Sequence, residues 1–249
     1  MRPLRAITVY LIFVLLGGAL LAPWLYEWVQ WGGAHSGWLH HLAENPFHRF
    51  VHRSLLGLAL IGLWPLLRGL GMRSWSDLGW TKPTGQWLRL LLGFGLGWAS
   101  LALVAVAATL AGARGAEWSH PAASYAGFLL KTLAAAILVA ALEETLFRGA
   151  LFGGLRRTLA WPAALLISSL VYAWVHFFQK PAPPAHIDWA TGLAQLAEMM
   201  RGFTDIQVMI PAFFALTLAG GLLALAYQRT GNLFCSIGLH AGWIFWLKA

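Results

Sequence analysis

Long apolar stretches separated by short polar segments dominate the chain. Seven of these stretches are candidates to cross a membrane as helices. They cover residues 6–26, 50–70, 88–112, 127–155, 161–179, 206–228 and 233–248. This pattern predicts an all-α fold, a polytopic transmembrane helical bundle of about seven helices.

Two connecting segments differ from ordinary loops. Residues 28–49 are rich in Trp and His, and we expect either a loop or an interfacial helix there. Residues 182–205 begin with prolines and then place Leu193, Leu196 and Met199 at helical spacing, with Met200 following. This second pattern predicts an interfacial amphipathic helix.

The first residues carry Arg2 and Arg5 and then run into apolar residues, which superficially resembles a signal peptide. The apolar run is too long for one and lacks a cleavage site of small residues, so we expect an uncleaved first span.

The composition excludes a soluble globular protein. Of 249 residues, 59% are hydrophobic and only 10% are charged, which is typical of an integral membrane protein. The net charge of +8 could suggest nucleic acid, but the basic residues stand singly near segment ends, as beside lipid headgroups. We therefore expect the lipid bilayer, and no nucleic acid, as a partner. The single cysteine, Cys235, is expected to be a packing residue.

The distribution of basic residues gives a weak orientation signal. With the N-terminus inside, nine basic residues fall on the inner side and seven on the outer side. The inner nine are Arg2, Arg5, Arg68, Arg73, Lys82, Arg89, Arg156, Arg157 and Arg229. The count favours a cytoplasmic N-terminus by this narrow margin.

The candidate chemistry centres on Glu143 and Glu144, which interrupt an apolar run between Lys131 and Arg157. Ionisable groups at membrane depth are costly and usually functional. The run is about 27 residues, or roughly 40 Å of helix, with basic residues at both ends. We therefore expect both glutamates near the middle of the bilayer.

Helical geometry separates the roles of the two glutamates. Glu144 and Arg148 are four residues apart and lie on one helical face, so we expect them to form an ion pair. Glu143 would then face an internal cavity as a candidate general base. The alternative is that all three residues form a structural ion network.

Two histidines lie in predicted spans, His176 and His240. Either one alone is usually a packed residue. Together with Glu143, on three separate helices, they can hold a water by hydrogen bonds or through a divalent metal such as zinc. Tyr172 should pack beside the ring of His176, one turn away. The remaining histidines, at 35, 40, 41, 48, 52, 120 and 186, are expected to be solvated.

This ordered set resembles the CPBP intramembrane proteases, also called the Abi or CAAX-protease family, and is similar to the type II CAAX prenyl endopeptidases. The resemblance lies in Glu143-Glu144-x-x-x-Arg148, then Tyr172-x-x-x-His176, then His240 in the last helix. It implies one membrane domain over residues 1–249, with variable helices in 1–124 and a catalytic helical core in 125–248.

The resemblance also implies an activity, namely intramembrane endopeptidase cleavage of a membrane-associated protein or peptide. Glu143 and His176 would activate the attacking water. Glu144 and Arg148 would hold the helix and the local charge, and His240 would stabilise the oxyanion or complete a metal site. Whether such proteases use a glutamate or a metal mechanism stays open, with Glu143, His176 and His240 as the metal ligands in the second case. The expected location is a bacterial inner membrane.

Two positions depart from the family pattern. Tyr172 stands where Phe is usual, and Ile244 stands four residues after His240 where Asn or Asp is common. The loss of an oxyanion donor could lower turnover by about a hundredfold or more. Two rival functions therefore stay open: a catalytically silent peptide-binding or bacteriocin-immunity protein, and a proton-coupled transporter that uses the glutamates as a relay.

Overall fold

The computed structural model describes residues 2–112, 122–203 and 206–248. These residues are helical apart from turns and short connections, with no strand among them, which confirms the predicted all-α class. They group into two compact units, one made of residues 1–72 and 170–217 and the other of residues 73–169 and 218–249. The helices α7 (Trp161–His176) and α9 (Ile206–Thr230) pass from one unit into the other. The predicted functional boundary at residue 125 stays a prediction.

The helices of the described residues match the predicted spans closely. Five are long and apolar enough to cross a membrane, and the protein is an integral membrane protein. They are α1 (Arg2–His35), α3 (Phe47–Gly69), α4 (Trp87–Leu110), the continuous run from α5 (Ala122–Glu144) to α6 (Gly153–Leu155), and α9. Shorter apolar helices, α7 and α10 (Phe234–Lys248), occupy the remaining two predicted spans.

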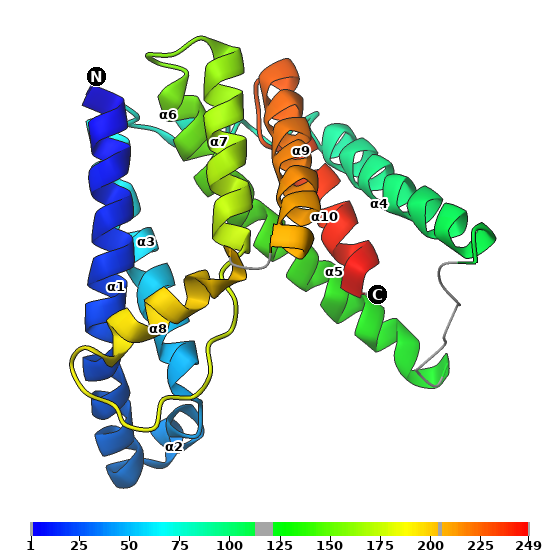
Figure 1. The fold of residues 1–249 in the computed structure, drawn as a ribbon. Coiled ribbons are helices and arrows are strands. Elements are labelled where there is room, and N and C mark those ends of the chain that lie inside the picture. Colours follow the sequence, from blue (N-terminus) through cyan, green and yellow to red (C-terminus); the bar gives the residue numbers. More distant parts are fainter. Residues whose placement is uncertain (1, 113–121, 204–205, 249) are drawn as a thin grey trace. The chain divides into compact units, whose positions relative to one another are not determined.

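The first unit is built on α1 and α3, which lie side by side (Figure 1). The segment predicted as a loop or helix is helical: α1 continues to His35, and α2 (Gly37–Ala43) follows. The predicted amphipathic helix is shorter than expected, α8 (Thr191–Met199), followed by the turn η3 (Met200–Phe203). It packs on α1 and α3, and Met199 joins the buried cluster of Ala22, Phe47 and Val51.

The second unit depends on close packing between α4 and α10 (Figure 1). A Cβ atom added to Gly93 or Gly97 of α4 would collide with backbone carbonyls of Cys235 and Leu239 on α10. These two glycines are four residues apart on one face of α4, which lets the two helices approach closely. A second pair four residues apart, Gly238 and Gly242, does the same from the α10 side, against the backbone of α4.

The helix that carries the two glutamates is not regular. After Glu144 it continues as a π-helix, η2 (Thr145–Phe152), before the final turn α6. The described helix begins at Ala122, earlier than the predicted span of 127–155. Single π-helical turns are rare and are often found at functional sites.

Candidate active site

The buried ion pair predicted from helical spacing is present. Arg148 Nη1 lies 2.9 Å from Glu144 Oε1, and both side chains are almost fully enclosed, at 2% and 0% exposure. Arg148 also donates through Nη2 to the Gly220 carbonyl of α9, at 3.1 Å. The guanidinium therefore links the π-helical segment to α9 within the second unit.

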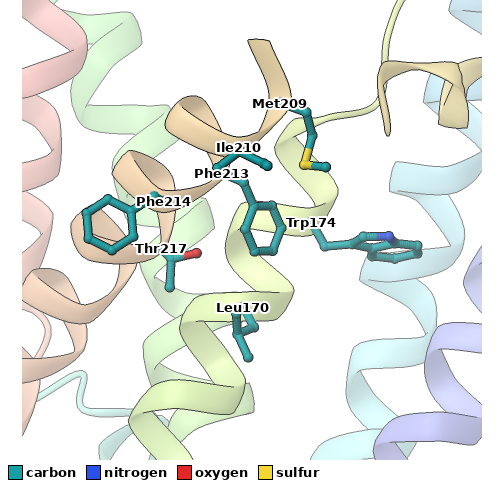
Figure 2. Close-up of a pocket in the computed structure, with 7 residues that line it drawn as sticks. All are labelled: Leu170, Trp174, Met209, Ile210, Phe213, Phe214 and Thr217. Atoms are coloured by element: carbon teal, nitrogen blue, oxygen red, sulfur yellow. The ribbon is translucent and has the colours of Figure 1, made fainter. Parts of the chain in front are cut away.

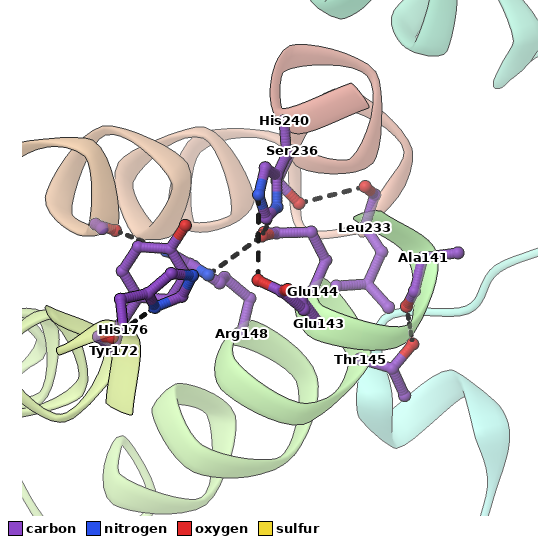
Figure 3. Close-up of polar contacts among 11 residues, drawn as sticks. Ala141, Glu143, Glu144, Thr145, Arg148, Tyr172, His176, Leu233, Ser236 and His240 are labelled. Atoms are coloured by element: carbon purple, nitrogen blue, oxygen red, sulfur yellow. Dashed lines mark hydrogen bonds and ion pairs between the residues drawn. The ribbon is translucent and has the colours of Figure 1, made fainter. Parts of the chain in front are cut away.

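Glu144 has a second partner that the sequence did not reveal. The Nδ1 atom of His240, on α10, lies 2.9 Å from the same Oε1 atom (Figure 3). Because a carboxylate in an ion pair accepts hydrogen bonds, this contact assigns the hydrogen of His240 to Nδ1. The second oxygen of Glu144, Oε2, is buried and has no hydrogen-bond partner among the described residues.

His240 lies between the two carboxylates. Its other nitrogen, Nε2, is 3.8 Å from Glu143 Oε2. This separation is longer than a direct hydrogen bond. With a hydrogen on Nδ1 directed to Glu144, Nε2 is the ring nitrogen of His240 on the side of Glu143. Glu143 is partly exposed while Glu144 is enclosed, so the two adjacent carboxylates have different environments.

A loop segment that was not predicted from the sequence contacts both the helix of Glu144 and the helix of His240. Residues 74–81 contain the short turn η1 (Trp75–Leu78), and Trp80 Nε1 donates to the Thr145 hydroxyl at 3.0 Å. Thr145 follows Glu144 directly, and its hydroxyl donates to the Ala141 carbonyl. The Trp80 ring also meets Phe234, near the start of α10, edge to face with centroids 5.9 Å apart.

Backbone contacts extend this connection. The N–H of Leu233, just before α10, donates to the Gly79 carbonyl at 3.1 Å. Asn232 Oδ1 accepts a hydrogen bond from the Phe234 N–H and so caps the start of α10. A Cβ added to Gly149 in η2 would lie 2.7 Å from the Leu78 carbonyl oxygen. The 74–81 segment therefore contacts the helix of Glu144 and the helix of His240 together.

The 74–81 segment has its own stabilising turn. Ser74 and Asp77 form a reciprocal capping box around η1. Hydrogen bonds from the Arg73 N–H and from the Ser74 hydroxyl and N–H lower the pKa of Asp77 to about 2. Asp77 Oδ1 also lies 3.4 Å from Arg157 Nη2.

His176 lies in the first unit, at the end of α7. Its Nδ1 is 2.7 Å from the Tyr172 carbonyl oxygen, and the two rings pack with centroids 4.3 Å apart, which confirms the predicted contact between them. Tyr172 is buried and His176 is exposed. The expected participation of His176 in a set with Glu143 and His240 stays a prediction.

The donor atoms of the second unit are compatible with part of a metal site. A histidine that binds a metal through one nitrogen usually donates from the other to a carboxylate, as His240 does to Glu144. Glu143 supplies a second donor. Catalytic zinc sites use three protein ligands, and the described residues contain no group of three or more His, Cys, Asp or Glu side chains placed to hold an ion. The third ligand of the predicted set would be His176.

The first unit contains an apolar pocket of about 590 Å³ (Figure 2). It lies between α7, from Leu170 to Trp174, and α9, from Met209 to Thr217. The side chains that line it are apolar except that of Thr217, and none of the predicted site residues is among them.

Most of the remaining histidines in the described residues are exposed, as predicted. His48 is an exception, since it lies in α3 and is buried. The prediction that it is solvated is wrong because α3 begins at Phe47 and turns this side chain inward. His120 lies outside the described residues.

Comparison with protein families supports the resemblance seen in the sequence. Residues 125–246 match the model of the family described as type II CAAX prenyl endopeptidase Rce1-like. The match includes all five predicted site residues. Searches of curated proteins and of solved structures give no match. Residues 125–246, just under half of the chain, are therefore similar to the Rce1-like family of type II CAAX prenyl endopeptidases, and this similarity supports a membrane protease with a protein or peptide substrate.

Proposed function

We propose that the protein is an intramembrane endopeptidase in which Glu143 is the general base. The observation that carries this proposal is the placement of Glu143 Oε2 3.8 Å from Nε2 of a buried histidine whose other nitrogen is held by Glu144. Similarity to the family supports peptide hydrolysis, and this geometry supports the choice of Glu143 over Glu144.

In this mechanism Glu143 and His176 bind the attacking water, and Glu143 accepts its proton. The water oxygen bonds to the carbonyl carbon of the scissile peptide. As the tetrahedral intermediate collapses, the C–N bond breaks and Glu143 returns the proton to the leaving nitrogen. Glu144 is less suitable as the base because its side chain is fully enclosed and its Oε1 atom already accepts hydrogen bonds from Arg148 and His240.

His240 is proposed to act on the oxygen of the intermediate. With Nδ1 held by Glu144, its ring orientation is fixed and Nε2 is the atom that faces the reaction. When His240 carries both protons, Nε2–H donates a hydrogen bond to the oxyanion. Arg148 is proposed as a positioning residue that balances the charge of Glu144 and fastens it to α9.

If a divalent metal is bound, Glu143, His240 Nε2 and His176 would hold it, and the metal would make a bound water more acidic. Metal analysis of the purified protein, with activity measured before and after chelation, distinguishes this chemistry from a metal-free glutamate mechanism.

The substrate is proposed to be a membrane-associated protein or peptide, and the location a bacterial inner membrane. The test compares terminal peptides in membranes of cells that produce the parental protein, the Glu143→Gln variant or the matched control Glu44→Gln. Glu44 carries an exposed carboxylate in the first unit. A terminus present with the parental protein and the control, but absent with Glu143→Gln, supports the proposal. If every terminus persists with Glu143→Gln, Glu143 is not the base.

One observation favours a second candidate, a peptide-binding or immunity protein without turnover. Ile244 lies on α10 where the family commonly has a residue with a hydrogen-bonding side chain, and an aliphatic side chain cannot donate to an oxyanion. A biological effect of the protein that survives in Glu143→Gln would support binding over catalysis.

A further inference from the structure

Basic side chains gather at one end of the second unit. They come from the connection before α4, the first turn of α4, the turn after α6 and the last turn of α9. All six are exposed: Arg73, Lys82, Arg89, Arg156, Arg157 and Arg229. In the described residues of these segments, Asp77 is the one acidic side chain. We call this set of six the basic end.

Contacts within the second unit hold these segments together, so the basic residues form one surface. Each contact joins two segments far apart in the sequence. They are Arg89 Nη1 to the Thr230 carbonyl (3.4 Å), Asn232 Nδ2 to Gln86 Oε1 (3.2 Å), Leu233 N to the Gly79 carbonyl (3.1 Å) and Arg157 Nη2 to Asp77 Oδ1 (3.4 Å).

Exposed tryptophans accompany the basic end. Trp75 in η1 is 70% exposed, and Trp87 and Trp161, the first residues of α4 and α7, are 60% and 45% exposed. Tryptophan is enriched where a membrane meets water, since its ring lies at the level of the lipid headgroups. Its presence here indicates that the basic residues lie at that same level and not far out in the aqueous phase.

The opposite ends of α4 and α10 show no comparable charge. Among the described residues toward that end of the unit, the basic side chains are Lys131 of α5 and Lys248 of α10. The described residues of this unit therefore show a larger asymmetry than the nine-to-seven count over the whole chain. Because α4 is 24 residues long, its two ends can reach the two faces of a bilayer.

We propose that the basic end binds the phosphate headgroups of anionic phospholipids and places this end of the protein at the cytoplasmic leaflet. Anionic lipids attract clustered Lys and Arg near the surface, and basic residues concentrate on the cytoplasmic side of membrane proteins. The proposal concerns the membrane partner and does not depend on peptidase activity.

The first test measures lipid selection directly. The full-length protein is reconstituted with equal amounts of phosphatidylglycerol and phosphatidylcholine, and the lipids retained are counted by native mass spectrometry. We expect the parental protein to retain phosphatidylglycerol in preference, and less so at high salt. A variant with four basic residues neutralised should show a smaller ratio of retained phosphatidylglycerol to phosphatidylcholine. The ratio should fall roughly fivefold for each headgroup contact removed. The four substitutions are Arg73→Gln, Lys82→Gln, Arg156→Gln and Arg229→Gln.

The matched control neutralises four exposed basic residues of the first unit, Arg49, Arg53, Lys180 and Arg201. It should keep most of the preference. Equal retention of both lipids by the parental protein, or an equal loss in the control, would overturn the proposal. Lipid retention by the parental protein at low and high salt tests the proposal even if a variant does not fold.

The second test concerns orientation. Thr84 is exposed in the connection before α4, and the single cysteine can be removed as Cys235→Ala. In that background, Thr84→Cys in intact cells should react with a membrane-impermeant maleimide only after the membrane is permeabilised. Labelling of intact cells would place the basic end outside and contradict the proposal.

Discussion

His240 Nδ1 and Glu144 Oε1 lie 2.9 Å apart, joining the last helix to the helix of the glutamate pair. The same oxygen accepts from Arg148, so a single buried carboxylate orients an imidazole and a guanidinium. The two adjacent glutamates therefore have different surroundings. Glu144 contacts both Arg148 and His240, while Glu143 Oε2 lies 3.8 Å from the second ring nitrogen of His240.

Arg148→Met should destabilise the protein strongly. Removing one partner of a buried ion pair leaves an uncompensated charge, which typically costs about 3–5 kcal/mol. Chemical unfolding in detergent would measure the loss. Adding Glu144→Gln to Arg148→Met removes the stranded charge and should recover part of the stability. If Arg148→Met unfolds at the parental denaturant concentration, the pair does not have the buried environment described.

The hydrogen bond between Trp80 and Thr145 should connect the 74–81 segment to the helix of Glu143 and Glu144. Trp80→Phe keeps an aromatic ring against Phe234 but removes the N–H, and Thr145→Val removes the hydroxyl. A double-mutant cycle on the free energy of unfolding should give a coupling of about 1 kcal/mol. Thr145→Ser should behave like the parental protein because it keeps the hydroxyl. Strictly additive effects of the two changes would show that the bond is not made.

Gly97→Ala should destabilise the contact between α4 and α10. The added methyl group collides with the Leu239 backbone, and overpacking of this kind costs roughly 1–3 kcal/mol. Gly95→Ala is the matched control, since a Cβ there meets no atom within 4 Å and alanine favours a helix. Thermal unfolding should therefore move in opposite directions for the two variants, and equal shifts would argue against the close packing.

Asp77 should stabilise the folded protein in a pH-dependent way. Its pKa falls from an ordinary value of 3.8 to about 2 on folding. The folded state therefore binds fewer protons, and the stabilisation is present above the ordinary pKa and is lost as the pH falls through the folded value. Asp77→Asn should lower the unfolding temperature at neutral pH, and the difference should shrink toward pH 2. A difference that does not change with pH would contradict this reading.

Local sequence spacing was sufficient to predict the helices and the pair of Glu144 with Arg148. Both depend on periodicity within one element: apolar residues set the length of each helix, and a separation of four residues places two side chains on one face. The same reasoning predicted the contact of Tyr172 with His176.

Other features depend on which elements meet in space. The bond from His240 to Glu144 joins residues 96 positions apart, and no local pattern specifies it. The role of Trp80 was missed because a tryptophan beside a predicted span is ordinarily an interfacial residue. The π-helical turn after Glu144 was missed because its residues are compatible with a regular helix. The residues that contact this turn, Trp80 and Leu78, belong to the separate 74–81 segment.

Glu143 is proposed to remove a proton from the attacking water. This role is tested by the rate at which purified protein, reconstituted in lipid, cleaves a substrate identified from the terminal peptides. Glu143→Gln keeps the shape of the side chain but not its basicity, and should lower kcat by about a hundredfold or more with an unchanged unfolding temperature. Cleavage by Glu143→Gln at the parental rate would show that Glu143 is not the base.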